Sequence, residues 1–121
     1  MNTACAHQDN AGLQSGIDAK TRLLRGLADA SRLAILETLR SGEQSVGELV
    51  RATGLAQSNV SNHLACLLGC GLVEREQRGR HVFYRLGGTR VEKLLGAADD
   101  LLGGLADATA TCPHCGGRKV A

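Results

Sequence analysis

Leucine recurs at helical spacing along most of the chain and predicts a mainly helical fold. Five segments place apolar residues three or four positions apart, the repeat of a helix with one buried face. These segments begin near Asp18, Asp29, Ser45, Gln57 and Thr89. Asp18 is the candidate N-cap of the first helix. Residues 1–16 have no such repeat, so we expect an arm there.

Capping motifs and glycines give the helix boundaries. Ser45 with Glu48 and Thr89 with Glu92 fit a capping box, in which each side chain satisfies a free backbone N–H of the other residue. Ala56 offers no such side chain, and Ser58 could cap the fourth helix one turn late. Glycines follow the second, third and fourth segments: Gly42, Gly54, and Gly69 or Gly71.

Two β-prone runs follow the fourth helix, at residues 72–77 and 81–86. Arg78-Gly79-Arg80 lies between them and supplies a turn glycine flanked by positive charge. Two short helices joined by a tight turn and followed by a hairpin predict a winged helix-turn-helix. The expected fold class is therefore mainly α with a β-hairpin wing (α+β).

The polar face of the fourth helix predicts DNA binding. Its short side chains pair donors with acceptors and could reach base edges or phosphates in a major groove. A merely solvated face would more often carry Glu and Lys. Beside it, Arg78 and Arg80 at the wing tip would hold phosphate. The residues expected to contact DNA are Gln57, Ser58, Asn59, Ser61, Asn62, His63, Arg78 and Arg80.

Composition adds limits on function. The 121 residues amount to about one domain, and 43% hydrophobic residues suffice for a core. The net charge of +2 is too small to indicate a nucleic-acid partner by itself, although residues 72–90 hold five arginines and two glutamates. No apolar run could cross a membrane, so we expect a cytoplasmic protein. We expect no small organic ligand.

Cysteine use predicts a metal site. Five cysteines are an odd number and do not suggest a disulfide framework. Cys66 and Cys70 are one helical turn apart, about 6 Å along the axis and about 40° around it, so both thiolates could bind one ion. They lie off the leucine face, which makes two buried small residues the weaker interpretation.

Two stretches closely resemble the ArsR/SmtB metal-responsive repressors: GLADASRLAILETL at 26–39 and SNVSNHLACLLGCGLVEREQRGRHVFYRL at 58–86. The resemblance extends over roughly residues 18–108. It implies a homodimer joined through the first and last helices, operator DNA bound by the metal-free form, and release when metal binds. We expect this domain at 17–109, between the arm at 1–16 and a tail at 110–121.

The Cys-x3-Cys spacing resembles the CmtR-like branch of that family. This branch is identified as sensing cadmium and lead through two helix cysteines and a third near the C-terminus, which implies Cys66, Cys70 and Cys112 here. Cys115 could replace Cys112 or bind with it. The inducer is therefore expected to be Cd(II) or Pb(II), with As(III) and Zn(II) as alternatives, since thiolates select soft ions.

Other functions of the cysteines stay open. The repressor could sense oxidants through Cys66 or Cys70 instead of metal. The CPHC sequence at 112–115 also occurs in thiol-disulfide oxidoreductases, but there it begins a helix that follows a strand, and here it follows a helix. Because of this context, we expect no enzyme activity. Together with Cys5 and His7, the CPHC sequence could also form a zinc knuckle.

Overall fold

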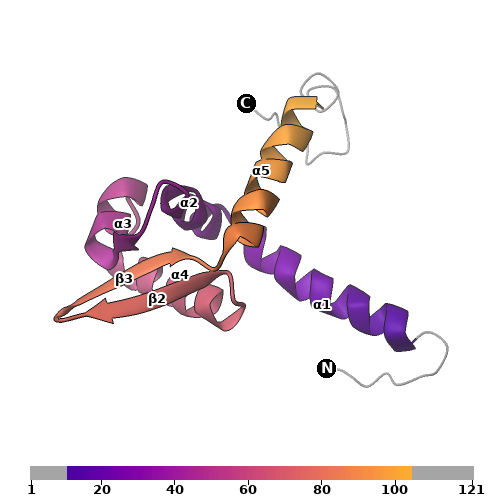
Figure 1. Ribbon diagram of the computed structural model, residues 1–121, viewed down its shortest axis with the longest axis horizontal. Coiled ribbons are helices and arrows are strands. Elements are labelled where there is room, and N and C mark those ends of the chain that lie inside the picture. Colours follow the sequence, from indigo (N-terminus) through magenta and orange to yellow (C-terminus); the bar gives the residue numbers. More distant parts are fainter. Residues whose placement is uncertain (1–10, 105–121) are drawn as a thin grey trace. The chain divides into compact units, whose positions relative to one another are not determined.

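The computed structural model describes residues 11–104. The chain divides into two compact units, and the boundary along the sequence lies between Gly87 and Gly88. The first unit contains α1 (Ala11–Leu27), α2 (Ala30–Leu39), β1 (Gln44–Ser45), α3 (Val46–Thr53), α4 (Gln57–Gly69), β2 (Val73–Arg78) and β3 (His81–Leu86) (Figure 1). The second unit contains α5 (Thr89–Gly104). Among these elements, none of the helices is long and apolar enough to cross a membrane.

The core of the first unit is aliphatic and comes from α2, α3, α4 and the start of β2. Leucine, isoleucine and valine side chains fill this core, as the leucine repeat predicts. Its buried side chains are Ile35, Leu36, Leu39, Leu49, Val60, Leu64, Leu67, Leu72 and Val73. This core holds α3 and α4 as two helices joined by three residues, and the β2–β3 hairpin follows. The predicted winged helix-turn-helix is therefore confirmed.

The sheet has three antiparallel strands in the order β1-β3-β2. The two residues of β1 were not predicted as a strand, because a two-residue run carries no alternation. They pair with β3 at Gln44–Tyr84 and Ser45–Phe83. This pairing attaches the wing to the segment that leads into α3.

The first helix begins earlier than predicted. Helix α1 starts at Ala11, so Asp18 is not its N-cap but an interior residue whose carboxylate accepts a hydrogen bond from Gln14 Nε2 at 3.2 Å. The arm interpretation is thus wrong for residues 11–16. Gly12 and Gly16 concealed the helix, since glycine is a poor helix former. Residues 1–10 of the predicted arm lie outside the described residues.

Three predicted helix ends are confirmed. Asp29 caps α2 by accepting from the Arg32 N–H at 3.0 Å. Ser45 and Glu48 form the capping box of α3, and Gly54 ends that helix in the left-handed conformation at φ 76°.

Two other helices begin at the predicted residues, Gln57 and Thr89, but their predicted side-chain caps differ. Helix α4 has Ala56 at its N-cap, without a side-chain hydrogen bond, and Ser58 lies inside the helix. Helix α5 already includes Thr89, and the carbonyl of Gly88 accepts from the Val91 N–H at 3.2 Å. The proposed Thr89 cap therefore does not begin α5, because a backbone carbonyl one residue earlier opens it.

Candidate nucleic-acid interface and candidate metal site

The first half of α4 presents an exposed face of uncommitted polar groups. Its buried face consists of Val60, Leu64 and Leu67, all fully buried. The opposite face carries five exposed polar residues: Gln57, Ser58, Asn59, Ser61 and Asn62. Within residues 11–104 none of these five side chains is engaged in a hydrogen bond or an ion pair. Their donors and acceptors are thus free for an external ligand, as the DNA interpretation requires.

His63 differs from these five residues because it is half-buried. The pKa of Asp29 is lowered, first because its carboxylate accepts the Arg32 N–H and then because the positive charges of Arg32 and His63 stabilise it. This places His63 near the N-cap of α2. His63 is therefore less open to an external ligand than the five exposed residues, and its contact with DNA stays a prediction.

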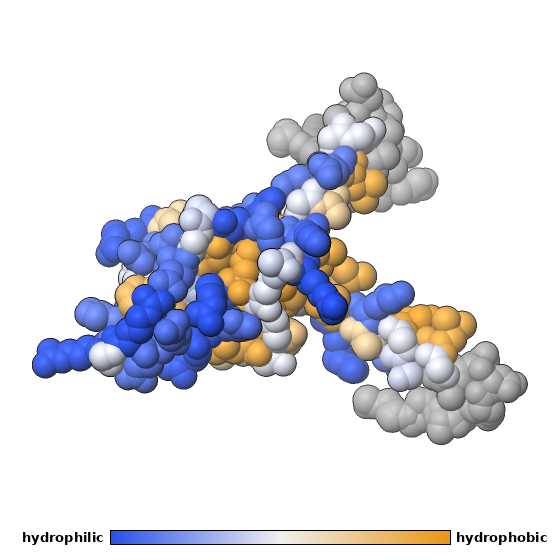
Figure 2. All heavy atoms as spheres, in the orientation of Figure 1, coloured by the Kyte–Doolittle hydropathy of each residue, from blue (hydrophilic) through white to orange (hydrophobic). Residues whose placement is uncertain are grey.

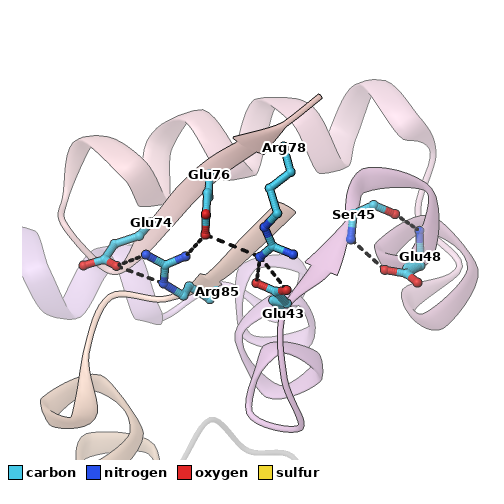
Figure 3. A network of polar contacts seen from close by, with 7 residues as sticks. All are labelled: Glu43, Ser45, Glu48, Glu74, Glu76, Arg78 and Arg85. Carbon is cyan, nitrogen blue, oxygen red and sulfur yellow. Dashed lines mark hydrogen bonds and ion pairs between the residues drawn. The ribbon is translucent and has the colours of Figure 1, made fainter. Parts of the chain in front are cut away.

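The wing carries a chain of ion pairs on its outer face. Arg85 pairs with Glu74 at 3.1 Å and with Glu76 at 3.0 Å (Figure 3). Arg78 pairs with Glu76 at 3.4 Å and also with Glu43, whose Oε2 lies 2.6 Å from Nη2. We call Glu43, Glu74, Glu76, Arg78 and Arg85 the wing ladder. It holds three carboxylates and two guanidinium groups, so its net charge is −1.

The ladder has electrostatic consequences for its members. The pKa of Glu76 is lowered by the hydrogen bond and charge of Arg78, with a smaller effect of Arg85. The pKa of Arg78 is raised, chiefly by its hydrogen bond with Glu43 and then by Glu76. The Arg78 guanidinium also lies over the Phe83 ring, with Cζ 4.6 Å from the centroid. Arg78 is therefore already occupied by three neighbours.

Arg80 is placed differently from Arg78. It follows Gly79, whose φ of 63° suits the first position of a two-residue turn, and its side chain is exposed. Within residues 11–104 it has no ion pair. Of the two wing-tip arginines predicted to hold phosphate, only Arg80 presents an uncompensated charge.

Cys66 and Cys70 are free thiols on the exposed surface near the end of α4. Cys70 lies beside the last turn of α1, because a methyl group added to Gly26 would lie 3.8 Å from Cys70 Sγ. Arg32 fixes the same turn by donating from Nε to the Gly26 carbonyl at 2.8 Å. Cys70 thus lies next to α1 as well as at the end of α4.

The described residues do not complete a metal site by themselves. Within 11–104 no three His, Cys, Asp or Glu side chains gather closely enough to hold one ion. Cys112 and Cys115, the other two predicted ligands, lie outside the described residues, as do Cys5 and His7. The described residues offer two accessible sulfur atoms one helical turn apart. These two donors suit a soft ion that takes further ligands.

Sequence reasoning missed Glu43 as a partner of the wing. It is 35 residues from Arg78, and only the β1–β3 pairing brings them together. The hairpin pattern could have indicated the other members of the wing ladder. Glu74, Glu76 and Arg78 alternate along β2 and share one face of the sheet with Arg85 of β3. The approach of Cys70 to Gly26 had no local signal.

Comparison with known proteins agrees with this architecture. The model of "Bacterial regulatory protein, arsR family" matches residues 29–75, from the N-cap of α2 into the wing. The transcriptional regulator CmtR of Mycobacterium tuberculosis is 47% identical over 78 residues, 64% of this chain. A probable mercury resistance operon repressor of Streptomyces lividans is 38% identical over 78 residues, 64% of this chain. The matches span 66% and 62% of these relatives, slightly less than two thirds.

Solved structures share the fold. The homodimeric winged helix-turn-helix DNA-binding domain of Mb0332 from Mycobacterium bovis, described as a possible ArsR-family regulator, superposes with a TM-score of 0.71. It is 28% identical, and the match covers 92% of this chain and all of that domain. These relatives are named as regulators or repressors of transcription or of an operon. The chain belongs to the arsR family of bacterial regulatory proteins.

Proposed function

We propose that this chain is a homodimeric transcriptional repressor that binds operator DNA without metal and leaves it when a thiophilic ion binds. The DNA contacts are the exposed polar face of α4 and the Arg80 side chain. The ion, Cd(II) or Pb(II), binds Cys66 and Cys70 together with Cys112, Cys115 or both. The observation that carries this proposal is that one helix bears both sets of groups: polar side chains at its start that have no partner among residues 11–104, and exposed thiols at its end.

The thiol pair has the chemistry that a soft ion needs. Each exposed sulfur can bind after loss of its proton, and a third thiolate from the tail would exclude hard cations. The relative named as a mercury resistance repressor supports a thiophilic ion as the effector. Because Cys70 adjoins α1, an ion bound there would act on both α4 and α1.

Dimerisation is supported by apolar stripes that have no partner within the described chain. On α1, Leu13, Ile17 and Leu24 fall within about 40° around the helix axis and are 67%, 45% and 53% exposed. On α5, Leu94, Leu101 and Leu102 are 36%, 63% and 60% exposed. Figure 2 shows this apolar surface in orange. Leucines at such spacing pack on a second helix, so we assign both stripes to the dimer.

The test begins with DNA chosen by the protein itself. The reduced, metal-free chain is used to select a duplex from a random pool, and its affinity is measured by fluorescence anisotropy. Cadmium, lead, zinc and arsenite are then titrated separately into the complex. We expect release by cadmium or lead at lower concentrations than by zinc. Release by arsenite or zinc alone would correct the ion, and release by peroxide without metal would favour the redox alternative.

Serine variants locate the sensing site. Cys66→Ser and Cys70→Ser should bind the selected duplex like the wild type but stay bound when cadmium is added. Cys112→Ser should behave in the same way, while Cys5→Ser serves as the control and should respond normally. A Cys70→Ser variant released at wild-type cadmium concentrations would show that the ion acts elsewhere.

A further inference from the structure

The wing needs an attachment near its tip. The β2–β3 pair extends through Arg78 and His81, beyond the short β1 strand that pairs only with Tyr84 and Phe83. A two-stranded ribbon is marginally stable by itself. Near its outer end, the Arg78–Glu43 ion pair joins the wing to the loop between α2 and β1.

We propose that Arg78 and Glu43 form a strut that fixes the wing relative to the helix-turn-helix, so that Arg78 positions the wing while Arg80 binds phosphate. This inference rests on the proposed DNA-binding function. The two arginines that flank Gly79 then have different roles: Arg78 is structural and Arg80 contacts DNA. The sequence alone does not distinguish them.

Geometry favours a positioning role for Arg78. One guanidinium nitrogen meets both carboxylate oxygens of Glu43, and the guanidinium also rests on Phe83, the residue paired with Ser45 of β1. Ser45 in turn caps α3. Two of the three contacts of Arg78, those with Glu43 and Phe83, therefore lead from the wing toward the start of the helix-turn-helix.

Charge on the outer face of the wing argues in the same direction. Glu74, Glu76, Arg78 and Arg85 share this face, because the register places Arg85 opposite Glu74 and His81 opposite Arg78. With Glu43 the wing ladder has net negative charge and would repel phosphate at close range. Val73, Arg75 and Tyr84 lie on the other face, where Val73 is 2% exposed and contacts the core. DNA is therefore expected at the turn and on the core side of the wing.

The opposing interpretation is that Glu43 masks Arg78 and gives way to phosphate when DNA binds. The two interpretations predict opposite signs for Glu43→Gln. A strut that loses its carboxylate should weaken DNA binding by about two- to fivefold, the range of exposed ion pairs. A mask that loses its carboxylate should strengthen binding, because a guanidinium group is released.

The experiment measures affinity for the selected duplex as a function of salt. Arg80→Gln should lower the slope of log Kd against log salt concentration by about one. Arg78→Gln should weaken binding about two- to fivefold with the slope unchanged, and Glu43→Gln with Arg78→Gln together should bind no more weakly than Arg78→Gln alone. Glu37→Gln, which removes a carboxylate from the surface pair with Arg40, controls for the change in net charge. Tighter binding by Glu43→Gln, or a reduced slope for Arg78→Gln, would overturn the strut.

A second measurement separates the strut from the proposed function. Amide hydrogen exchange in the free protein should speed up about two- to fivefold at residues 76–83 in Glu43→Gln, and stay at wild-type rates there in Glu37→Gln. Unchanged exchange at the wing would refute the strut. If the wild type bound no DNA but the exchange rose as expected, the proposed function would fail while the strut would stand.

Discussion

At the residue scale, Gly87 lies so close to the backbone of a neighbouring segment that a side chain would not fit there. Gly87 donates its N–H to the Leu72 carbonyl at 2.9 Å. A methyl group added there would lie 2.3 Å from the Gly71 carbonyl oxygen and 3.1 Å from the Leu72 carbonyl carbon. Because both neighbours are backbone atoms, the strand or the α4–β2 turn would have to move. This approach fixes the end of β3 against the start of β2.

Gly87→Ala should therefore lower the free energy of unfolding by about 1–3 kcal/mol, the usual effect of overpacking. Gly69→Ala is the matched control, since an added methyl group meets nothing within 4 Å there and alanine is the better helix former. Urea denaturation followed by circular dichroism measures both. Equal stability of the two variants would show that the Gly87 contact is not tight.

The carboxylate of Asp29 should make stability depend on pH. Its pKa lies below the ordinary 3.8 in the folded chain, so the charged form stabilises the fold above pH 3.8, and this contribution disappears as the pH falls through the folded-state value. Asp29→Asn keeps an N-cap side chain but has no charge. Its Tm should be below that of the wild type at pH 5, and the gap should narrow as the pH falls below 3.8 toward the folded-state pKa. A gap that does not narrow as the pH falls below 3.8 would contradict this assignment.

At the element scale, α4 divides its length between two tasks. Its first two turns carry Ser61 and Asn62, whose side chains have no hydrogen-bond partner in the described part of the chain, and its end carries the thiols Cys66 and Cys70. The buried residues Val60, Leu64 and Leu67 hold the whole helix on the core. A displacement of its end would thus be transmitted along a rigid element to the polar face.

Asn62→Ala should reduce the preference for the selected duplex over random DNA more than it weakens DNA binding overall. A side chain that reads a base edge contributes about 1–3 kcal/mol of discrimination, so the ratio of random to selected Kd should fall roughly tenfold. Arg80→Ala should instead weaken binding to both duplexes by the same factor, since phosphate contacts carry no sequence information. If Asn62→Ala left the ratio unchanged, the exposed face of α4 would not be the reading surface.

The sequence predicts most of these elements because their signals are local. The capping box at Ser45, the helix start at Asp29 and the leucine face of α4 depend on residues within one or two turns, and the structure has all three. The Arg78–Glu43 pair and the contact of Cys70 with Gly26 connect residues far apart in the chain. Such contacts depend on tertiary packing, which periodicity does not describe. The early start of α1 was missed because its apolar stripe is exposed and interrupted by glycines.

At the scale of the whole molecule, the unpaired apolar stripes of α1 and α5 predict a dimer. Leu101 is 63% exposed and Leu102 is 60% exposed in the single chain. Leu101→Glu should weaken association by several kcal/mol, because the charge would be buried without a partner. Lys93→Glu changes an exposed charged residue of the same helix and should leave the dimer intact. Sedimentation equilibrium measures both, and a monomeric wild type at micromolar concentration would refute the dimer.

Metal binding and DNA binding are proposed to form one linked equilibrium through α4. Coupling between two sites is reciprocal, so the factor by which cadmium weakens DNA binding must equal the factor by which DNA weakens cadmium binding. Such factors are typically about 5–150. The most direct test is calorimetric titration of cadmium into the reduced protein, with and without the selected duplex. We expect weaker cadmium binding to the complex by the same factor that anisotropy gives for the DNA. Equal cadmium affinity in both titrations would contradict the proposal.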